Sequence, residues 1–199
     1  MFCHSKSVRQ FLLLMSRESH LPALFQLFRQ QGYDGVSLAN ISEATGLGKA
    51  SLYHHFPGGK AEMVQATLAY SQAWFEENVL RVLMQDKPVQ ERLREMCDRL
   101  DTLYESGEQP CLMAALIAGA PRDALQMQVR DRLESLVGAI ATMLTAAGLS
   151  KTIAKERGED AVIAIQGALI LSQGTGNSKP FTRILSQLPD RLCEGLPAV

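Results

Sequence analysis

The sequence predicts an all-α fold in which a small N-terminal group of three helices precedes a larger C-terminal helical bundle. Apolar residues recur at the three- and four-residue spacing of helices throughout, whereas alternating β-branched runs and Asn-Gly hairpin turns are nearly absent. Glycine and proline divide these periodic segments at intervals. The chain has 199 residues, 46% hydrophobic and 21% charged. It is therefore long enough to bury a real core, and its composition is typical of a globular protein.

The first helix is expected over residues 21–31, where leucine and phenylalanine recur on one face. Proline is tolerated only in the first turn of a helix, so Pro22 favours Ser19 as the N-cap, and Gly32 ends the helix. After a GYDGVS loop, Ser37 is placed to cap a second helix. The apolar side of this helix is expected to be Leu38, Ile41 and Ala44.

A tight turn at residues 46–48 leads to a third helix at about residues 49–56, which Pro57-Gly58-Gly59 ends. Residues 37–56 thus have the length and the turn position of a helix-turn-helix, whose second helix enters the major groove of DNA. Leu52 and Phe56 lie one turn apart and are expected to point into a shared core. The outward face has no acidic residue and holds Ala50 and His54, flanked by Ser51, Tyr53 and His55, with Lys49 in the first turn.

A long helix is expected from Lys60 past Val82, and the remaining segments form a bundle. Its helices are expected at about residues 88–105, 111–118, 121–147, 152–173 and 180–193. The first fourteen residues fit no cap or pairing, so they are either an upstream extension or a flexible arm able to touch nucleic acid. We divide the chain into an extension or arm (1–15), a DNA-binding domain (16–62) and a ligand-binding and dimerisation domain (63–199).

The charge distribution also separates the two parts. Residues 1–60 carry six Lys/Arg against three Asp/Glu, whereas the remainder carries 14 against 18. A basic N-terminal part indicates a polyanionic partner there.

Three alternatives compete for the histidine pair in SLYHHFPGGK: a metal site, an acid/base site and a surface for a polyanion. Adjacent helical residues diverge by about 100°, so His54 and His55 cannot easily share one ion. A catalytic site would need a carboxylate that orients a histidine, or a nucleophile paired with a base, and neither arrangement is found nearby in sequence. Tyrosine, histidine and serine donate hydrogen bonds to phosphate, Lys49 could donate to guanine, and Ala50 could meet a thymine methyl. Solvated histidines at a helix end remain the simple alternative.

The stretch LFRQQGYDGVSLANISEATGLGKASLYHHFPGGKAEM resembles the DNA-binding domain of the TetR/AcrR family of bacterial transcription regulators. The resemblance covers about residues 16–70 and matches at many spaced positions. It implies a helical homodimer that binds a palindromic double-stranded operator and carries an effector pocket in its C-terminal bundle. The segment FPGGKAEM is similar to the corresponding segment of an LmrA/YxaF-like subgroup. The family's DNA contacts fall here on Ser37, Ala39, Asn40, Lys49, Ala50, Ser51, Tyr53, His54, His55 and Lys60.

Two departures from the family's pattern stand out. Gly48 occupies the position where Ser or Thr normally caps the recognition helix, and His20 and Pro22 interrupt a first helix that is usually continuous and aliphatic. Glycine in place of serine at an N-cap costs only a few tenths of a kcal/mol. These departures do not change the assignment.

The C-terminal part has no Gly-rich phosphate loop, no GxSxG and no clustered carboxylates, so we expect no enzyme activity, cofactor or metal. Effector contacts are assigned to Trp74, Phe75, Met96, Cys97, Tyr104, Cys111 and Met113, although plain core packing would produce the same stripes. Cys97 and Cys111 could instead be redox sensors, but no nearby cation supports this.

The helix around residues 161–171 is apolar almost all round, so a partner subunit or the chain itself must cover it. The expected dimer interface comprises Ile163, Ile170, Phe181, Ile184, Leu185 and Leu188.

The four scattered cysteines form no CxxC pair and suit a reducing cytoplasm. The apolar run at residues 161–171 is far shorter than a membrane span, so no membrane association is expected. The function predicted is that of a ligand-responsive transcription repressor. The rival is a helical ligand-binding protein or enzyme in which the helix-turn-helix is only structural.

Overall fold

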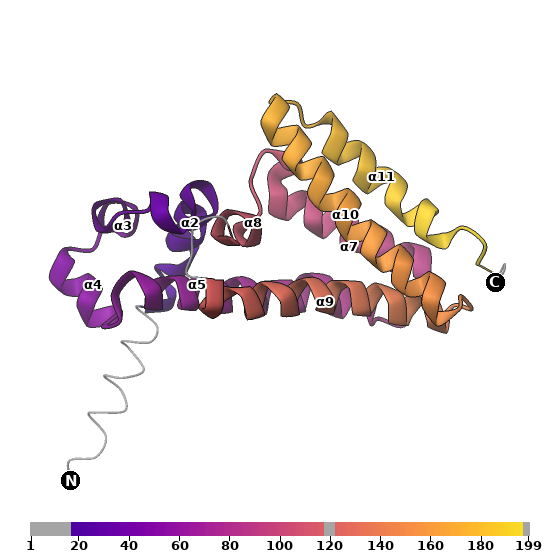
Figure 1. Cartoon of the computed structure of the whole chain (residues 1–199), viewed down its shortest axis with the longest axis horizontal. Helices are drawn as coiled ribbons and strands as arrows, with labels where there is room; N and C mark the ends of the chain where they lie inside the picture. The colour runs from indigo at the N-terminus through magenta and orange to yellow at the C-terminus, as the bar shows by residue number, and fades with distance from the viewer. Residues whose placement is uncertain (1–16, 118–121, 197–199) are drawn as a thin grey trace, which may run out of the picture.

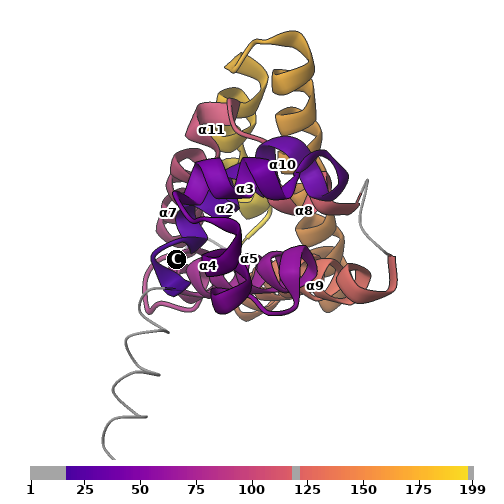
Figure 2. The same ribbon diagram turned by 90° about the vertical axis from the view of Figure 1, so that its left-hand side faces the viewer.

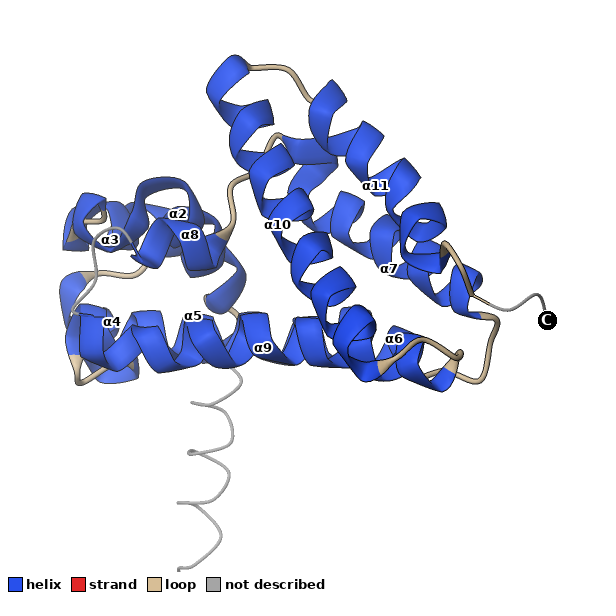
Figure 3. Cartoon of the chain, turned by 45° about the vertical axis from the view of Figure 1, so that its right-hand side comes forward, coloured by secondary structure: helices blue, strands red, loops and turns tan. Residues whose placement is uncertain are grey.

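The computed structural model describes residues 17–117 and 122–196, and every regular element in these ranges is helical (Figure 3). This confirms the all-α fold class. The helices are α2 (Leu21–Gly35), α3 (Leu38–Thr45), α4 (Lys49–His55), α5 (Gly59–Phe75), α6 (Arg81–Leu83), α7 (Val89–Tyr104), α8 (Leu112–Ile117), α9 (Arg122–Ala146), α10 (Lys151–Thr175) and α11 (Lys179–Cys193), with a π-helical turn at Glu76–Leu80 and a 3-10 turn at Glu105–Gly107.

Helices α2, α3 and α4 form one end of the elongated molecule (Figure 1). Helix α5 leads from this end into the body, where α9 runs alongside it, and α10 and α11 lie above with α7 (Figures 1 and 3). Viewed onto that end, α3 and α4 face outward, while the C-terminal helices lie behind them (Figure 2). The helix-turn-helix is therefore at the tip of the molecule.

The start of α2 differs from the expectation. Its N-cap is His20 rather than Ser19, and Pro22 lies in the first turn as proline should. The backbone leaves helical geometry at Gly32 (φ 67°, ψ −173°), and one more turn follows to Gly35. A Cβ at Gly32 would lie 2.8 Å from the backbone oxygen of Ala115, so this glycine is what lets α2 approach α8 closely.

Helix α3 is capped as predicted. The Asn40 backbone N–H donates to Ser37 Oγ at 3.2 Å, and the Ser37 backbone N–H donates to Asn40 Oδ1 at 3.0 Å, which closes a capping box. The assignment of Ala44 to the apolar side was wrong, because Ala44 is exposed. Thr45 is half-buried one position later, and its hydroxyl donates to the carbonyl of Ile41 at 2.6 Å.

The long helix after Pro57-Gly58 is confirmed, with one irregularity. It is helical from α5 through the π-helical turn to α6, and its π-helical part spans Glu76–Leu80. Our division of the chain between residues 62 and 63 thus falls within α5, where no linker separates the parts.

One contiguous core runs from α2 to α11. Three residues assigned to a dimer interface, Phe181, Leu185 and Leu188, belong to this core, with at most 4% of each exposed. They face α7 and α10 of their own chain, so they offer no surface to a partner, and that part of the assignment was wrong. Phe181 packs edge-on against Tyr104, with ring centroids 5.7 Å apart. In the described ranges, no helix combines the length and hydropathy required to cross a membrane.

Candidate nucleic-acid interface and internal cavity

Helix α4 presents two distinct faces at the tip of the molecule. Leu52 and Phe56 are buried in the core, as predicted from their spacing. Lys49, Ala50, Ser51 and His54 are exposed on the opposite face, and 42% of Tyr53 is exposed beside them. The inward pair fixes the orientation of the helix, and the outward face offers cationic, hydroxyl and imidazole groups without any carboxylate of its own.

The two histidines differ in position. His54 is exposed, whereas His55 is half-buried and its ring lies 5.8 Å from that of His20, between centroids. Burial, with smaller contributions from the charges of His20, His54 and Arg17, lowers the pKa of His55. His54 is therefore the one that faces outward, and His55 packs back toward the start of α2.

The start of α5 is already organised by neighbouring side chains. The Gly58 backbone N–H donates to Glu62 Oε2 at 2.7 Å, and Glu62 forms a 2.9 Å ion pair with Arg17, whose guanidinium lies over the Phe56 ring. Lys60 Nζ lies 4.5 Å from the ring centroid of Tyr33. Glu62 already accepts the Gly58 N–H and pairs with Arg17, so neither of these donors is available to an external anion. Lys60 has no carboxylate partner among the described residues and is the side chain of this helix start that is suited to bind an anion.

The three remaining DNA-contact candidates lie at the start of α3. Ala39 is exposed, and Ser37 and Asn40 use their side chains for each other in the capping box. These two side chains also support the backbone geometry that leads into the helix-turn-helix. Their contact with DNA stays a prediction.

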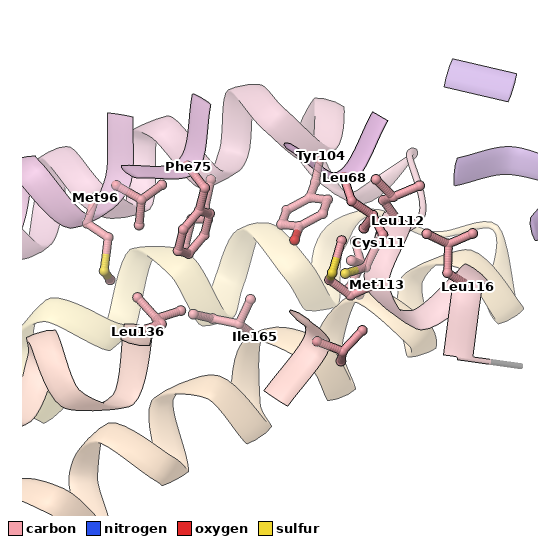
Figure 4. Packing of buried hydrophobic residues seen from close by; sticks show 14 of the residues in the cluster. Leu68, Phe75, Met96, Tyr104, Cys111, Leu112, Met113, Leu116, Leu136 and Ile165 are labelled. Carbon is pink, nitrogen blue, oxygen red and sulfur yellow. The ribbon is translucent and has the colours of Figure 1, made fainter. Parts of the chain in front are cut away.

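A small cavity lies inside the body, between α2, α5, α7, α8, α9 and α10. Its volume is about 40 Å³, which is room for a few water molecules. Phe75, Tyr104, Cys111 and Met113 line it, four of the seven residues predicted for an effector site. Figure 4 shows these four in one interior region, with Leu136 and Ile165 on the facing helices.

The other three predicted residues lie elsewhere. Met96 and Cys97 are buried in the core on α7 and line no part of this cavity, while Trp74 lines an adjoining pocket at the surface. Burial raises the pKa of Cys97 to about 12, so its thiol stays protonated and unreactive near neutral pH.

Sequence reasoning missed the two charged residues of the cavity wall, Arg29 and Arg132. Arg29 is 2% exposed and Arg132 is 9% exposed. In the sequence they resemble any cation on an amphipathic helix, whose long stem normally reaches solvent. The one sequence signal for burial was that Arg29 lies close to the apolar Phe25 and Phe28, and this signal is weak.

The remaining dimer candidates lie on helices α10 and α11. Ile163 and Ile170 are 67% and 64% exposed on one side of α10, Leu171 is exposed beside them, and Ile184 is half-buried on α11. Exposed large aliphatic side chains at this spacing form an apolar stripe on the helix. Among the described residues, no group of three or more His, Cys, Asp or Glu could hold a metal ion.

Two family sequence models match the chain. The model for "Bacterial regulatory proteins, tetR family" matches residues 21–67, and the model for "Transcriptional regulator LmrA/YxaF-like, C-terminal domain" matches residues 87–187, about half of the chain. The chain belongs to the TetR family of bacterial regulatory proteins. This confirms the resemblance and the subgroup, and identifies a transcriptional regulator of a DNA-binding, helix-turn-helix family.

Relatives of this TetR-family regulator are similar over most of their length. The HTH-type transcriptional regulator LmrA of Bacillus subtilis is 26% identical, covering 89% of this chain and 96% of LmrA. The nucleoid occlusion factor SlmA of Vibrio vulnificus is 24% identical over 84% of each chain. The crystal structure of a TetR-family regulator from Agrobacterium tumefaciens shares the fold with a TM-score of 0.77, at 23% identity over 90% of this chain and 98% of that one.

Proposed function

We propose that this regulator is a homodimeric repressor that binds a palindromic operator through α4 and leaves it when a small, largely apolar effector occupies the internal cavity. The observation that supports this most directly is the outward face of α4, anchored by Leu52 and Phe56 and carrying no acid. Lys49 and Ala50 are the candidates for base contacts, and Ser51, Tyr53, His54 and Lys60 for phosphate contacts. His55 then acts by holding α4 against α2 rather than by touching DNA.

The proposed dimer interface lies on α10 and would place two α4 helices against the two halves of a palindromic operator. The exposed Ile163 and Ile170 lie seven residues apart, on the same side of the helix, with the small Gly167 between them. Two copies packed along this stripe would cover side chains that are otherwise in water. They would also present two α4 helices to half-sites about 34–36 Å apart or a close variant of that spacing.

The cavity is placed to couple effector binding to DNA binding. Its wall includes Phe25 and Arg29 of α2, the helix that α3 packs against, and α3 in turn contacts α4. Gly32 brings the same helix against the backbone of Ala115 in α8, the helix that also carries the cavity residues Leu112 and Met113. An effector larger than the closed cavity must move these elements apart. It therefore favours a state with a different spacing of the two α4 helices.

The experiment measures binding of fluorescein-labelled DNA from the protein's own promoter by fluorescence anisotropy, for the wild type and for the double variant Tyr53→Ala/Lys60→Ala. We expect specific binding that weakens steeply with salt, because each neutralised phosphate releases counterions, and a large loss in the variant. Lys151→Ala removes one exposed positive charge from the start of α10 and should bind like wild type.

The rival function is a helical ligand-binding protein or enzyme in which the helix-turn-helix is only structural. It predicts no specific DNA binding at moderate salt, or equal binding by the wild type and the double variant. Either result would refute the proposed repressor.

A further inference from the structure

The cavity is lined by two cations that have no counter-ion in the part of the chain that the structure describes. Arg29 and Arg132 both line it, and more than nine-tenths of each residue is buried. Among the described residues, neither guanidinium forms an ion pair with a carboxylate. Glu105 and Glu76 are the carboxylates whose charges reach Arg29 and Arg132, respectively, but only at longer range.

The polar partners that these groups do have are neutral. Arg29 Nη2 donates to the backbone oxygen of Leu103 at 3.2 Å, and its Nε has no hydrogen-bond partner among the described residues. Arg132 donates from Nε to Gln72 Oε1 and from Nη2 to Ser71 Oγ at 3.4 Å. Each guanidinium also lies over an aromatic ring, at 5.2 Å for Arg29 and 4.5 Å for Arg132, but an aromatic face does not neutralise a charge.

Burying a cation without an anion is unfavourable, and both side chains show it. Burial lowers the pKa of Arg29 and of Arg132 from the usual value of a guanidinium, although arginine remains protonated. Tyr104 lies near both groups, and burial raises the pKa of its hydroxyl, so it stays neutral and cannot serve as the missing anion. A buried charge left unpaired in the free protein is the feature expected of a site that a charged ligand completes.

The surroundings indicate the rest of the ligand. Apart from these polar groups, the cavity is lined mainly by large apolar side chains, including Phe75, Leu136 and Ile165. Arg29 also lines an adjoining pocket of about 280 Å³ between α2, α5 and α7, and Arg132 lines one of about 270 Å³ between α5 and α9. Each arginine thus lies where the closed cavity meets an outer pocket. Opening either boundary would provide the few hundred Å³ that a small ligand needs.

We propose that the effector is a small organic anion, a carboxylate carried on an apolar ring or chain, whose acid group binds between Arg29 and Arg132. This rests on the proposed effector role of the cavity and names the chemical class of its ligand. The carboxylate accepts hydrogen bonds from the free Arg29 Nε–H and from Arg132, and the apolar body lies among the phenylalanine and leucine side chains. Because Arg29 belongs to α2, the acid group contacts the DNA-binding domain directly.

The test compares acids with uncharged amides of the same shape. Benzoate, naphthalene-2-carboxylate and hexanoate, each with its carboxamide, are titrated into the full chain without DNA by isothermal titration calorimetry. We expect at least one acid to bind about tenfold to hundredfold more tightly than its amide, the range for a charge-assisted hydrogen bond. If no acid binds more tightly than its amide, the proposal is wrong.

Three variants locate the anion contact. Arg132→Gln should abolish the preference for the acid, Arg132→Lys should retain most of it, and Arg130→Gln, which removes an exposed charge on the same helix, should leave it unchanged. An Arg132→Gln protein that folds and keeps the full preference would overturn the proposal. If that variant does not fold, the wild-type comparison decides alone.

The calorimetry is independent of DNA binding, so the two proposals can fail separately. An acid that binds tightly without releasing promoter DNA supports the ligand class and refutes the repressor mechanism.

Discussion

Leu52 and Tyr53 are adjacent on α4, but Leu52 is buried whereas Tyr53 is partly exposed, so replacing each by alanine separates stability from DNA binding. Leu52 is 1% exposed in the core. Leu52→Ala removes three carbons, worth roughly 2.4 kcal/mol of transfer free energy, and the residual cavity raises the total to about 3–4 kcal/mol. For a chain of this length that corresponds to a fall in melting temperature of about 6–16 °C.

Tyr53→Ala should leave stability nearly unchanged and weaken DNA binding. Tyr53 is 42% exposed and is not part of the buried core, so the free energy of unfolding should change by at most about 1 kcal/mol. Loss of a hydrogen bond to a phosphate costs about 1.5–3 kcal/mol, so operator affinity should fall about tenfold to hundredfold. Urea unfolding followed by circular dichroism gives the stability, and fluorescence anisotropy with promoter DNA gives the affinity.

The two measurements together can refute the reasoning. If Leu52→Ala unfolds like wild type, the inward orientation of α4 is wrong. A Tyr53→Ala protein that binds the operator like wild type would show that the outward face does not contact DNA at this residue.

Three further predictions concern other parts of the molecule. Gly32→Ala should destabilise the chain by more than about 2 kcal/mol in urea unfolding, because its φ of 67° is strained for alanine and the new Cβ would lie 2.8 Å from the Ala115 backbone oxygen. Ile170→Lys should convert a dimer to a monomer in light scattering, since it places a charge in the apolar stripe. Because burial lowers the pKa of His55 in the folded state, the unfolded chain takes up the proton first, so the free energy of unfolding is unaffected above about pH 6.5 and falls as the pH drops from there through the lowered folded-state pKa. His55→Gln should therefore flatten the pH dependence of the urea midpoint in this window.

Each of these predictions has a matched control. Gly46→Ala, at a φ of 70° with nothing within 4 Å of the new Cβ, should cost only about 1–2 kcal/mol, and an equal loss at both glycines would contradict the close approach of α2 and α8. Met84→Lys changes an exposed methionine outside α10 and should leave the dimer intact; a monomer there too would remove the argument for the stripe. His54→Gln should leave the acid sensitivity in place, and its loss would mean that His55 is not the source.

Local features of this protein were readable from its sequence because the interactions behind them are short in range. The Ser37 cap uses an asparagine three residues later, and the inward turn of α4 follows from the four-residue interval between Leu52 and Phe56. The same applies to most helix boundaries and to the outward set on α4. The Ser19 cap failed because Ser and His at the start of α2 compete within two residues, and sequence preference cannot resolve that difference.

Tertiary structure decided which apolar side chains lie in the core and which are exposed at the surface. Ile170 and Phe181 are both large and apolar on neighbouring helices, yet one is 64% exposed and the other fully buried, because only one side of α10 packs against α9 and α11. The cavity likewise depends on tertiary structure, because residues of α2 and α9 that are about a hundred positions apart in the sequence line it together with residues of α5, α7, α8 and α10. Arg29 and Arg132 appear in the sequence as ordinary cations. Their burial without a carboxylate depends on what surrounds them in space, which helical periodicity does not encode.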